Sequence, residues 1–293
     1  MLFWLTACVL FQSGAIDCAK DEPCVPETGV EETGGGDDTQ VQDTNPPVLD
    51  PVMGAWITGQ DSQGYLVNYL PPSGSMELLW FGTQPILAAA QDSTHLIGVS
   101  EKGELVDLKT DTVMATLPHL HTDLAVVNGQ VIVATRYSLY RNISGVFSQI
   151  STGSFSDLQH IVNDGSGGLY GVERVDGNMR LLRGTSSGWG VQIAAYDDRV
   201  DRSLDLFLGQ GDKPMTCSSD GSVYLIEELA LGNTVPWRKP SADVENVQAC
   251  SFDAGSQSVL LLSKEKGLFR VAPDGEVSVV DLAMQGTSAF FSE

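Results

Sequence analysis

Basic residues are scarce in this sequence: its 293 residues include 16 Lys and Arg against 38 Asp and Glu, which gives a formal net charge of -22. A protein that binds nucleic acid needs a basic face, because its affinity comes from neutralising phosphates and releasing their counterions. Anionic lipid headgroups require the same kind of face. The composition therefore excludes nucleic acid as a partner, and a membrane is expected as a partner only through a lipid anchor.

Long apolar runs are also missing. The opening stretch MLFWLTACVLFQSGA is apolar and uncharged, but it is shorter than the ~20 residues of a membrane-spanning helix. It is typical of an export signal, which we predict over residues 1–17. Two processing sites stay open. The tetrapeptide Leu5-Thr6-Ala7-Cys8 resembles a bacterial lipobox, which would make Cys8 the lipidated residue, whereas Ser13 and Ala15 suit cleavage after Ala15.

Cysteine is sparse, with five residues and no C-x-x-C spacing. Zinc-ribbon and thiol-redox sites therefore have no support in the sequence. In an oxidising compartment two pairs are candidates for disulfides, Cys18 with Cys24 and Cys217 with Cys250. A bridge requires Cα atoms within about 7 Å of each other, and spacing along the chain does not fix that distance.

Apolar periodicity is absent from residues 18–50, where Glu, Asp, Thr, Gly and Pro predominate. Such a segment cannot bury a core, so we predict a disordered acidic linker. Behind an export signal, the linker suits a protein held away from a membrane, and it equally suits a secreted chain with a free tail. The predicted location is the bacterial cell envelope, as an outer-membrane lipoprotein or in the periplasm, or the extracellular space.

Helical periodicity is missing after residue 50, where short runs rich in Val, Leu, Ile, Tyr and Phe alternate with polar turns. This pattern is typical of strands and hairpins. One type of turn recurs and ends in glycine, at Gly64, Gly103, Gly177, Gly221 and Gly267. Intervals near or twice about 40 residues indicate four-stranded propeller blades. Each of these glycines is expected at positive φ, as hairpin turns require.

Alignment of the repeats predicts an all-β fold with a single six-bladed β-propeller over residues 51–293. The innermost strands of five blades are expected at ILAAA, DLAVV, DLQHIV, LDLFLG and NVQACSF, and the outer strand of the fifth blade at TVPWRK. The first blade then lacks its innermost strand, while the final stretch GTSAFFSE supplies one strand too many. We predict that this C-terminal strand joins the first blade and closes the ring.

Two hairpins, KGLFRVAPDGEV and GGLYGVERVDGNM, resemble those of NHL-type, gluconolactonase-like and strictosidine-synthase-like six-bladed propellers. The resemblance implies a propeller with a central channel. Enzymes of this group bind a metal in the channel through Glu, Asn and Asp. No such set is evident in this sequence, so the resemblance carries the fold and no activity.

The junction before the third blade, His119-Leu120-His121-Thr122-Asp123, is the most suggestive cluster. Alternate residues of an extended strand share one face, so His119, His121 and Asp123 are candidate binding residues. The two histidines are the candidates for a metal ion. The simpler interpretation is a polar connection whose histidines are solvated or bonded to the backbone.

Other polar features have plainer interpretations. The junction YDDRVDRS offers candidate binding residues, which otherwise form exposed ion pairs of little energy: Asp197, Asp198, Arg199 and Arg202. His160 lies in an inner strand and is interpreted as a hydrogen-bonded core residue. The motif GTSSG at 184–188 matches the G-x-S-x-G of hydrolases, but no helix follows it, so we predict a loop between two strands.

No catalytic set accompanies these features. The sequence therefore predicts a monomeric, non-enzymatic propeller of the cell envelope that binds a small molecule or a protein, or serves as a scaffold. This function requires no cofactor. The alternative is a metal-dependent hydrolase, lactonase or lyase acting in the propeller channel.

Overall fold

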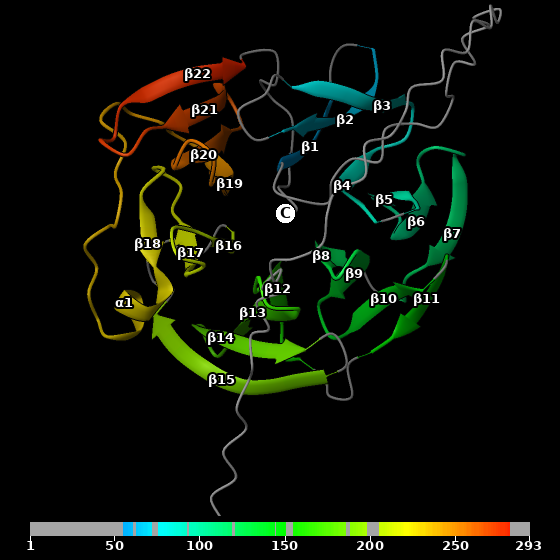
Figure 1. The fold of residues 1–293 in the computed structure, drawn as a ribbon, viewed down its shortest axis with the longest axis horizontal. Helices are drawn as coiled ribbons and strands as arrows, with labels where there is room; N and C mark the ends of the chain where they lie inside the picture. The colour runs from blue at the N-terminus through cyan, green and yellow to red at the C-terminus, as the bar shows by residue number, and fades with distance from the viewer. Residues whose placement is uncertain are drawn as a thin grey trace, which may run out of the picture. The chain divides into compact units, whose positions relative to one another are not determined.

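A computed structural model describes residues 55–60, 63–71, 76–92, 94–118, 121–143, 145–150, 155–185, 188–197 and 205–281. All of them belong to the second of two units into which the chain divides, residues 47–293. They form six antiparallel sheets arranged in a ring, which confirms the predicted β-propeller (Figure 1). Several predicted features lie outside the described residues: the export signal, the lipidation site Cys8, the linker, the pair Cys18–Cys24 and the C-terminal closing strand.

Each sheet is one blade, and its strands follow the chain from the axis outwards (Figure 1). Blade 1 holds β1 (Ala55–Gln60), β2 (Tyr65–Leu70) and β3 (Glu77–Gly82). Blade 2 holds β4 (Ile86–Gln91), β5 (Leu96–Ser100), β6 (Glu104–Asp107) and β7 (Thr112–Thr116). Blade 3 holds β8 (His121–Val127), β9 (Gln130–Thr135), β10 (Leu139–Ile143) and β11 (Val146–Gln149).

The second half of the ring is less regular. Blade 4 holds β12 (Leu158–Asn163), β13 (Gly168–Val175), β14 (Asn178–Thr185) and β15 (Gly188–Asp197). Blade 5 holds β16 (Phe207–Leu208), β17 (Pro214–Cys217), β18 (Val223–Leu225) and the helix α1 (Ile226–Ala230). Blade 6 holds β19 (Val247–Asp253), β20 (Ser258–Ser263), β21 (Gly267–Val271) and β22 (Val277–Asp281).

The core lies between neighbouring blades, because successive residues of a strand point to opposite faces of its sheet. In β8, Leu124 packs with side chains of blade 2, whereas the next residue, Ala125, packs with Leu158 and Ile161 of blade 4. Burial of each large apolar side chain contributes about 1.5 to 3 kcal/mol. Within the described residues the sheets are therefore separate ladders, held together by the packing of their faces.

Blade 6 meets blade 1 in the same way. Ala249, Leu260 and Leu262 pack with Ile57 and Leu70 in one buried cluster. This interface completes the ring within the described residues. Blade 1 contains three strands in this part of the chain, as the alignment of the repeats predicts.

Blade 5 differs from its prediction. The expected outer strand TVPWRK makes only one isolated bridge, between Val223 and Arg238. In its place the chain leaves β18 directly into α1, which buries Ile226 and Leu229 against blade 4 and β17. Pro236 has no N–H to donate to a sheet ladder. The strand prediction is wrong here because a buried apolar pair and a proline replace the alternation of a strand.

The recurrent turn glycines adopt the predicted conformation at four positions, with φ of 76° at Gly103, 79° at Gly177, 78° at Gly221 and 94° at Gly267. Gly64 is the exception and has no positive φ. A Cβ atom there would lie 2.6 Å from the carbonyl oxygen of Gly82, so close packing requires glycine at this position.

Alanine substitutions at two of these turns should separate backbone strain from crowding. Both G177A and G221A place a side chain at positive φ, which costs about 1 to 2 kcal/mol. A Cβ on Gly177 meets nothing within 4 Å, whereas one on Gly221 would lie 2.8 Å from Leu261 Cδ1 and 3.1 Å from Pro240 Cγ. Overpacking adds about 1 to 3 kcal/mol. Urea denaturation should therefore show the larger loss for G221A, and equal losses would contradict the crowding.

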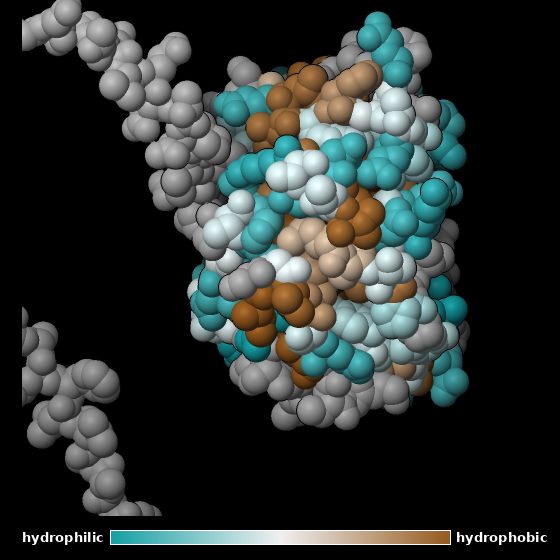
Figure 2. All heavy atoms as spheres, turned by 90° about the vertical axis from the view of Figure 1, so that its right-hand side faces the viewer, coloured by the Kyte–Doolittle hydropathy of each residue, from teal (hydrophilic) through white to brown (hydrophobic). Residues whose placement is uncertain are grey.

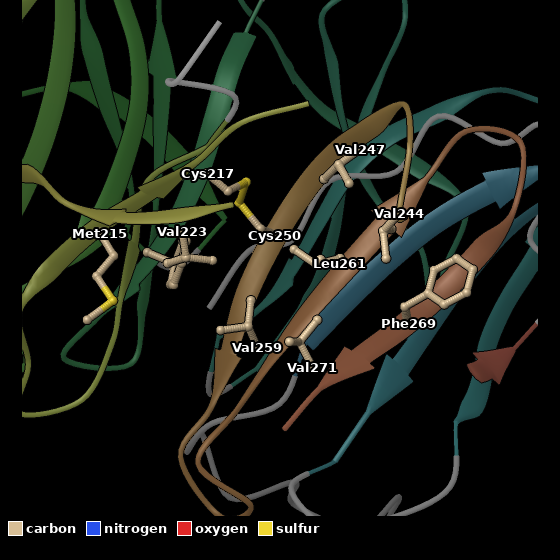
Figure 3. Close-up of a cluster of buried hydrophobic side chains, with 11 residues drawn as sticks. Met215, Cys217, Val223, Val244, Val247, Cys250, Val259, Leu261, Phe269 and Val271 are labelled. Carbon is tan, nitrogen blue, oxygen red and sulfur yellow. A yellow bond between two sulfur atoms is a disulfide. The ribbon is translucent and has the colours of Figure 1, made fainter. Parts of the chain in front are cut away.

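Cys217 of β17 and Cys250 of β19 form a disulfide, with their Cα atoms 6.6 Å apart. Figure 3 shows this bond joining blades 5 and 6 inside a cluster of apolar side chains that includes Val223 and Leu261. Both cysteines are almost fully buried, at 0% and 1% exposure. The bond therefore adds a covalent link between two blades that also pack through their side chains.

The perimeter of the ring exposes apolar side chains on the outer strands of five blades. They are Leu78 and Phe81 in blade 1, Val113 in blade 2, Val146 in blade 3, Ile193 in blade 4 and Val279 in blade 6. Figure 2 views the ring from the side of β7 and shows hydrophobic groups separated by hydrophilic ones. These exposed side chains are distributed over the blades, so the perimeter does not single out one of them. No helix in the described part of the chain is long and apolar enough to cross a membrane.

Candidate functional site

Four of the innermost strands have a β-bulge near their first residues. The register shifts between Ile86 and Ala88 in β4, between His121 and Asp123 in β8, between Leu158 and His160 in β12, and between Val247 and Ala249 in β19. A bulge inserts one extra residue and re-aims the side chains that follow. The residues directly after the bulge are therefore equivalent: Ala88, Asp123, His160 and Ala249.

The Asp123 carboxylate fastens blade 3 to blade 4. Oδ1 accepts a hydrogen bond from the N–H of Leu124 at 2.8 Å, and Oδ2 accepts one from the N–H of Ile161 at 2.9 Å. Ile161 directly follows the equivalent position in blade 4. The carboxylate is thus held by its own strand and by the next one.

Asp205 occupies the same position in blade 5. Its Oδ1 accepts from the N–H of Leu206 at 2.9 Å, and its Oδ2 accepts from the N–H of Cys250 at 3.1 Å. Cys250 follows Ala249, just as Ile161 follows His160. Asp205 therefore fastens blade 5 to blade 6 at the residue that also carries the disulfide.

His160 lies between these two carboxylates. Its Nδ1 is 3.5 Å from Asp123 Oδ2 and 3.6 Å from Asp205 Oδ1. The Nδ1 atom is buried and has no hydrogen-bond partner, although 16% of the side chain remains exposed. We refer to Asp123, His160 and Asp205 as the Asp–His–Asp cluster. It is the one group of three or more His, Cys, Asp or Glu side chains in the described blades whose ligand atoms all lie within 4.8 Å of one another.

The surroundings of Asp205 and His160 in the cluster shift the pKa values of both groups. Burial and, to a smaller extent, the Asp123 carboxylate raise the pKa of Asp205 to about 7, against the opposing effects of His160 and the two N–H donors. Burial alone would lower the pKa of His160, but the carboxylates of Asp123 and Asp205 outweigh burial and raise it. Both groups therefore hold protons more tightly than they would in an unfolded chain.

Other partly buried carboxylates behave in the opposite way. Backbone N–H groups hold Asp92 and Asp164 in tight turns, and the Ser218 hydroxyl and the Ser222 N–H hold Asp220. Although burial works against these hydrogen bonds, they lower the pKa of each carboxyl. Arg183 adds a contact to Asp164 at 2.9 Å. These three carboxylates stay ionised and stabilise turns. Among the described carboxyl groups, that of Asp205 in the Asp–His–Asp cluster has its pKa raised towards neutral pH.

The structure describes only part of the first predicted site. Asp123 belongs to the cluster, but its partners are His160 and Asp205. His121 is the first residue of β8, and His119 lies outside the described residues. His160 lies in the inner strand β12, as expected, and its Nδ1 faces the carboxylates of Asp123 and Asp205 at 3.5 and 3.6 Å.

The second predicted site lies mostly outside the described residues, which exclude Asp198, Arg199 and Arg202. Asp197 is the exposed last residue of β15. The GTSSG motif joins β14 to β15, where Thr185 pairs with Gly188. The prediction of a loop between two strands is confirmed there.

Asp205 is the member of the cluster that the sequence reasoning missed. A signal was present, because Asp123-Leu124 and Asp205-Leu206 are the same dipeptide at the same place in two inner strands. Asp157-Leu158 is a third copy of this dipeptide. Aligning it with the other two copies displaces the repeat of blade 4 by three residues, because the equivalent position in blade 4 is His160. Asp157 instead accepts hydrogen bonds from Arg136.

Comparisons with known proteins yield structural likeness and no relative in sequence. No protein-family model matches the chain, and no curated protein matches it. Hsv2 from Kluyveromyces lactis superposes with a TM-score of 0.45 and 14% identity, over 75% of each chain. TolB from Acinetobacter baumannii superposes with a TM-score of 0.49 and 13% identity, over 82% of this chain and 67% of its own. Likeness at these identities concerns the fold alone, which the six described sheets define as a six-bladed β-propeller.

Proposed function

We propose that this chain is an exported, non-enzymatic propeller of the bacterial cell envelope that binds a ligand or a protein partner. The observation that carries the proposal is the buried disulfide between Cys217 and Cys250. Disulfides persist in oxidising compartments and are rare in the cytosol. A bond that joins two blades in the interior suits a ring kept rigid outside the cell.

The face that we propose for binding is the one at which the innermost strands begin, which we call the upper face. In antiparallel blades the turns between the second and third strands lie at this same end. The Asp–His–Asp cluster lies near it, because Asp123 and His160 are the third residues of β8 and β12. Several other described carboxylates are bound in turns, which favours a recognition role for the cluster.

The proposal includes the route of export, the relation to other propellers and the oligomeric state. A lipid anchor at Cys8 or cleavage after Ala15 would place the ring at the outer membrane, in the periplasm or outside the cell. A relation to NHL-type or gluconolactonase-like propellers is supported by the two hairpins quoted above. We propose a monomer as the working form.

Site-specific photo-crosslinking in a Gram-negative host tests location and face together. A photoreactive residue replaces one exposed lysine at a time, at Lys102 or Lys264 on the upper face and at Lys109 or Lys213 on the opposite face. We expect the full chain in the envelope fraction, and in denaturant Cys217 and Cys250 should resist alkylation until they are reduced. We also expect discrete crosslinked species from the upper-face positions.

Two results would count against the proposal. A chain that stays in the cytoplasm with free thiols would exclude export. Equal crosslinking from both faces would exclude a defined binding face, because the lysines of the opposite face have the same chemistry and similar exposure.

A metal-dependent hydrolase, lactonase or lyase is the second candidate. One observation favours it: His160 and Asp205, whose pKa values are both raised, lie together near the ring axis, and groups that titrate near neutral pH suit acid–base chemistry. Turnover of lactones or aryl esters by metal-loaded protein, lost in D205N, would favour this candidate over simple binding.

A further inference from the structure

The starting observation is that His160 Nδ1 makes no hydrogen bond. This atom is buried, and it lies 3.5 Å from Asp123 Oδ2 and 3.6 Å from Asp205 Oδ1. Buried polar atoms in native proteins nearly always have a partner. A buried ring nitrogen between two carboxylates therefore requires an explanation.

The distances do not fit hydrogen bonds. N–H···O bonds have donor–acceptor distances of about 2.7 to 3.2 Å, whereas the two separations here are 3.5 and 3.6 Å. They do fit two ligands of one metal ion. Zinc binds imidazole nitrogen and carboxylate oxygen at about 2.0 to 2.2 Å, and at tetrahedral angles such ligands lie about 3.4 Å apart.

Backbone N–H groups already fix the orientation of both carboxylates. Asp123 is held by the N–H groups of Leu124 and Ile161, and Asp205 is held by those of Leu206 and Cys250. Hydrogen bonds of this kind fix metal-binding carboxylates in place and raise metal affinity. Each oxygen has a second lone pair, so these bonds leave the carboxylates able to bind an ion.

We propose that Asp123, His160 and Asp205 bind one divalent transition-metal ion, with zinc as the best match. One imidazole and two carboxylates form a donor set of the kind that zinc accepts. Three protein ligands leave one tetrahedral position for water or for a group of a bound ligand. The 16% exposure of the His160 side chain leaves the site within reach of solvent. The proposal does not depend on the binding function proposed above, since an ion here could equally support a structural role.

Zinc binding by the full chain tests the proposal. Protein stripped with a chelator and dialysed should take up about one zinc ion per chain in isothermal titration, with the ion retained in elemental analysis. H160A should lose affinity at least about tenfold. Cobalt added in place of zinc should give visible absorption bands in the wild type that are absent in H160A.

His95 provides the matched control. Its Nδ1 lies 3.4 Å from Asp92 Oδ1, but it also contacts Thr94 Oγ1. H95A should therefore bind zinc like the wild type. Retention of full affinity by H160A, or loss of zinc in H119A/H121A alone, would overturn the proposal.

Crystals of the wild type soaked in zinc keep the proposal testable if H160A fails to fold. Anomalous scattering at the zinc edge should give one peak between Asp123 and Asp205. A peak elsewhere, or no uptake of zinc by the wild type, would overturn the proposal. A defect in export or crosslinking leaves these measurements unaffected, so the two proposals fail separately.

Discussion

Removal of the Cys217–Cys250 disulfide should lower the free energy of unfolding by about 3 to 4 kcal/mol. The cysteines are 33 residues apart, and a cross-link that closes a loop of this size restricts the unfolded chain by about that amount. The effect should be concentrated in blade 5, whose sheet has only three strands, two of them with two and three residues. Hydrogen exchange in the C217A/C250A variant should therefore show blade 5 opening before the other blades.

The matched control is C18A/C24A, which removes the same number of cysteines from the predicted linker. Urea denaturation of this variant should match the wild type under oxidising conditions. A C217A/C250A variant that unfolds like the wild type would show that packing and the hydrogen bond from the Cys250 N–H to Asp205 hold blade 5 to blade 6 without the disulfide.

Metal-free protein should lose stability as the pH rises from 5 to 8. The pKa of Asp205 is raised to about 7, so the folded state retains a proton that the unfolded state releases near pH 4. Unfolding then becomes easier with rising pH until the folded pKa is passed. A shift of about three pKa units corresponds to a loss on the order of 2 to 4 kcal/mol.

His160 acts in the same direction. Its pKa is also raised, so the stability contributed by its charge is present below its ordinary pKa and is lost as the pH rises through the folded value. Asp92, Asp164 and Asp220 have lowered pKa values. Their contribution is lost only when the pH falls below their ordinary range. The pH range in which the cluster loses stability is therefore separate from the acidic range in which the three turn carboxylates lose theirs.

Urea denaturation at several pH values, in the presence of a chelator, checks this dependence. D205N mimics the protonated carboxyl and should flatten the curve between pH 5 and 8. D212N is the control, since Asp212 is exposed in a turn and its substitution should leave the slope unchanged. An identical slope in D205N would show that the general acidity of the chain, and not the cluster, sets the dependence.

The fold was largely predictable because its signals are local. Turn glycines and short apolar runs repeat with each blade, and the positive φ at Gly103, Gly177, Gly221 and Gly267 follows from hairpin geometry. The helix α1 was not predictable in the same way. Its five residues are too few to show a helical period, and burial of Ile226 and Leu229 against other elements fixes its conformation.

The cluster was harder to predict because it depends on register between blades. Asp123, His160 and Asp205 are separated by about forty residues, and a bulge in each of the strands β8 and β12 decides which residue faces the next blade. A pattern of apolar and polar residues does not locate such a bulge. The candidate pair Cys217 and Cys250 was accessible from composition, whereas its proximity required the ring.

The positions equivalent to the cluster on the other side of the ring are alanines, Ala88 in blade 2 and Ala249 in blade 6. Their methyl groups are buried in apolar interfaces. The backbone thus repeats around the axis, but its charge does not. An ion or molecule near the axis would therefore meet ionisable groups on the side of blades 3 to 5 and alanine methyl groups at the equivalent positions of blades 2 and 6. The repeat architecture therefore provides one asymmetric site in place of several equivalent ones.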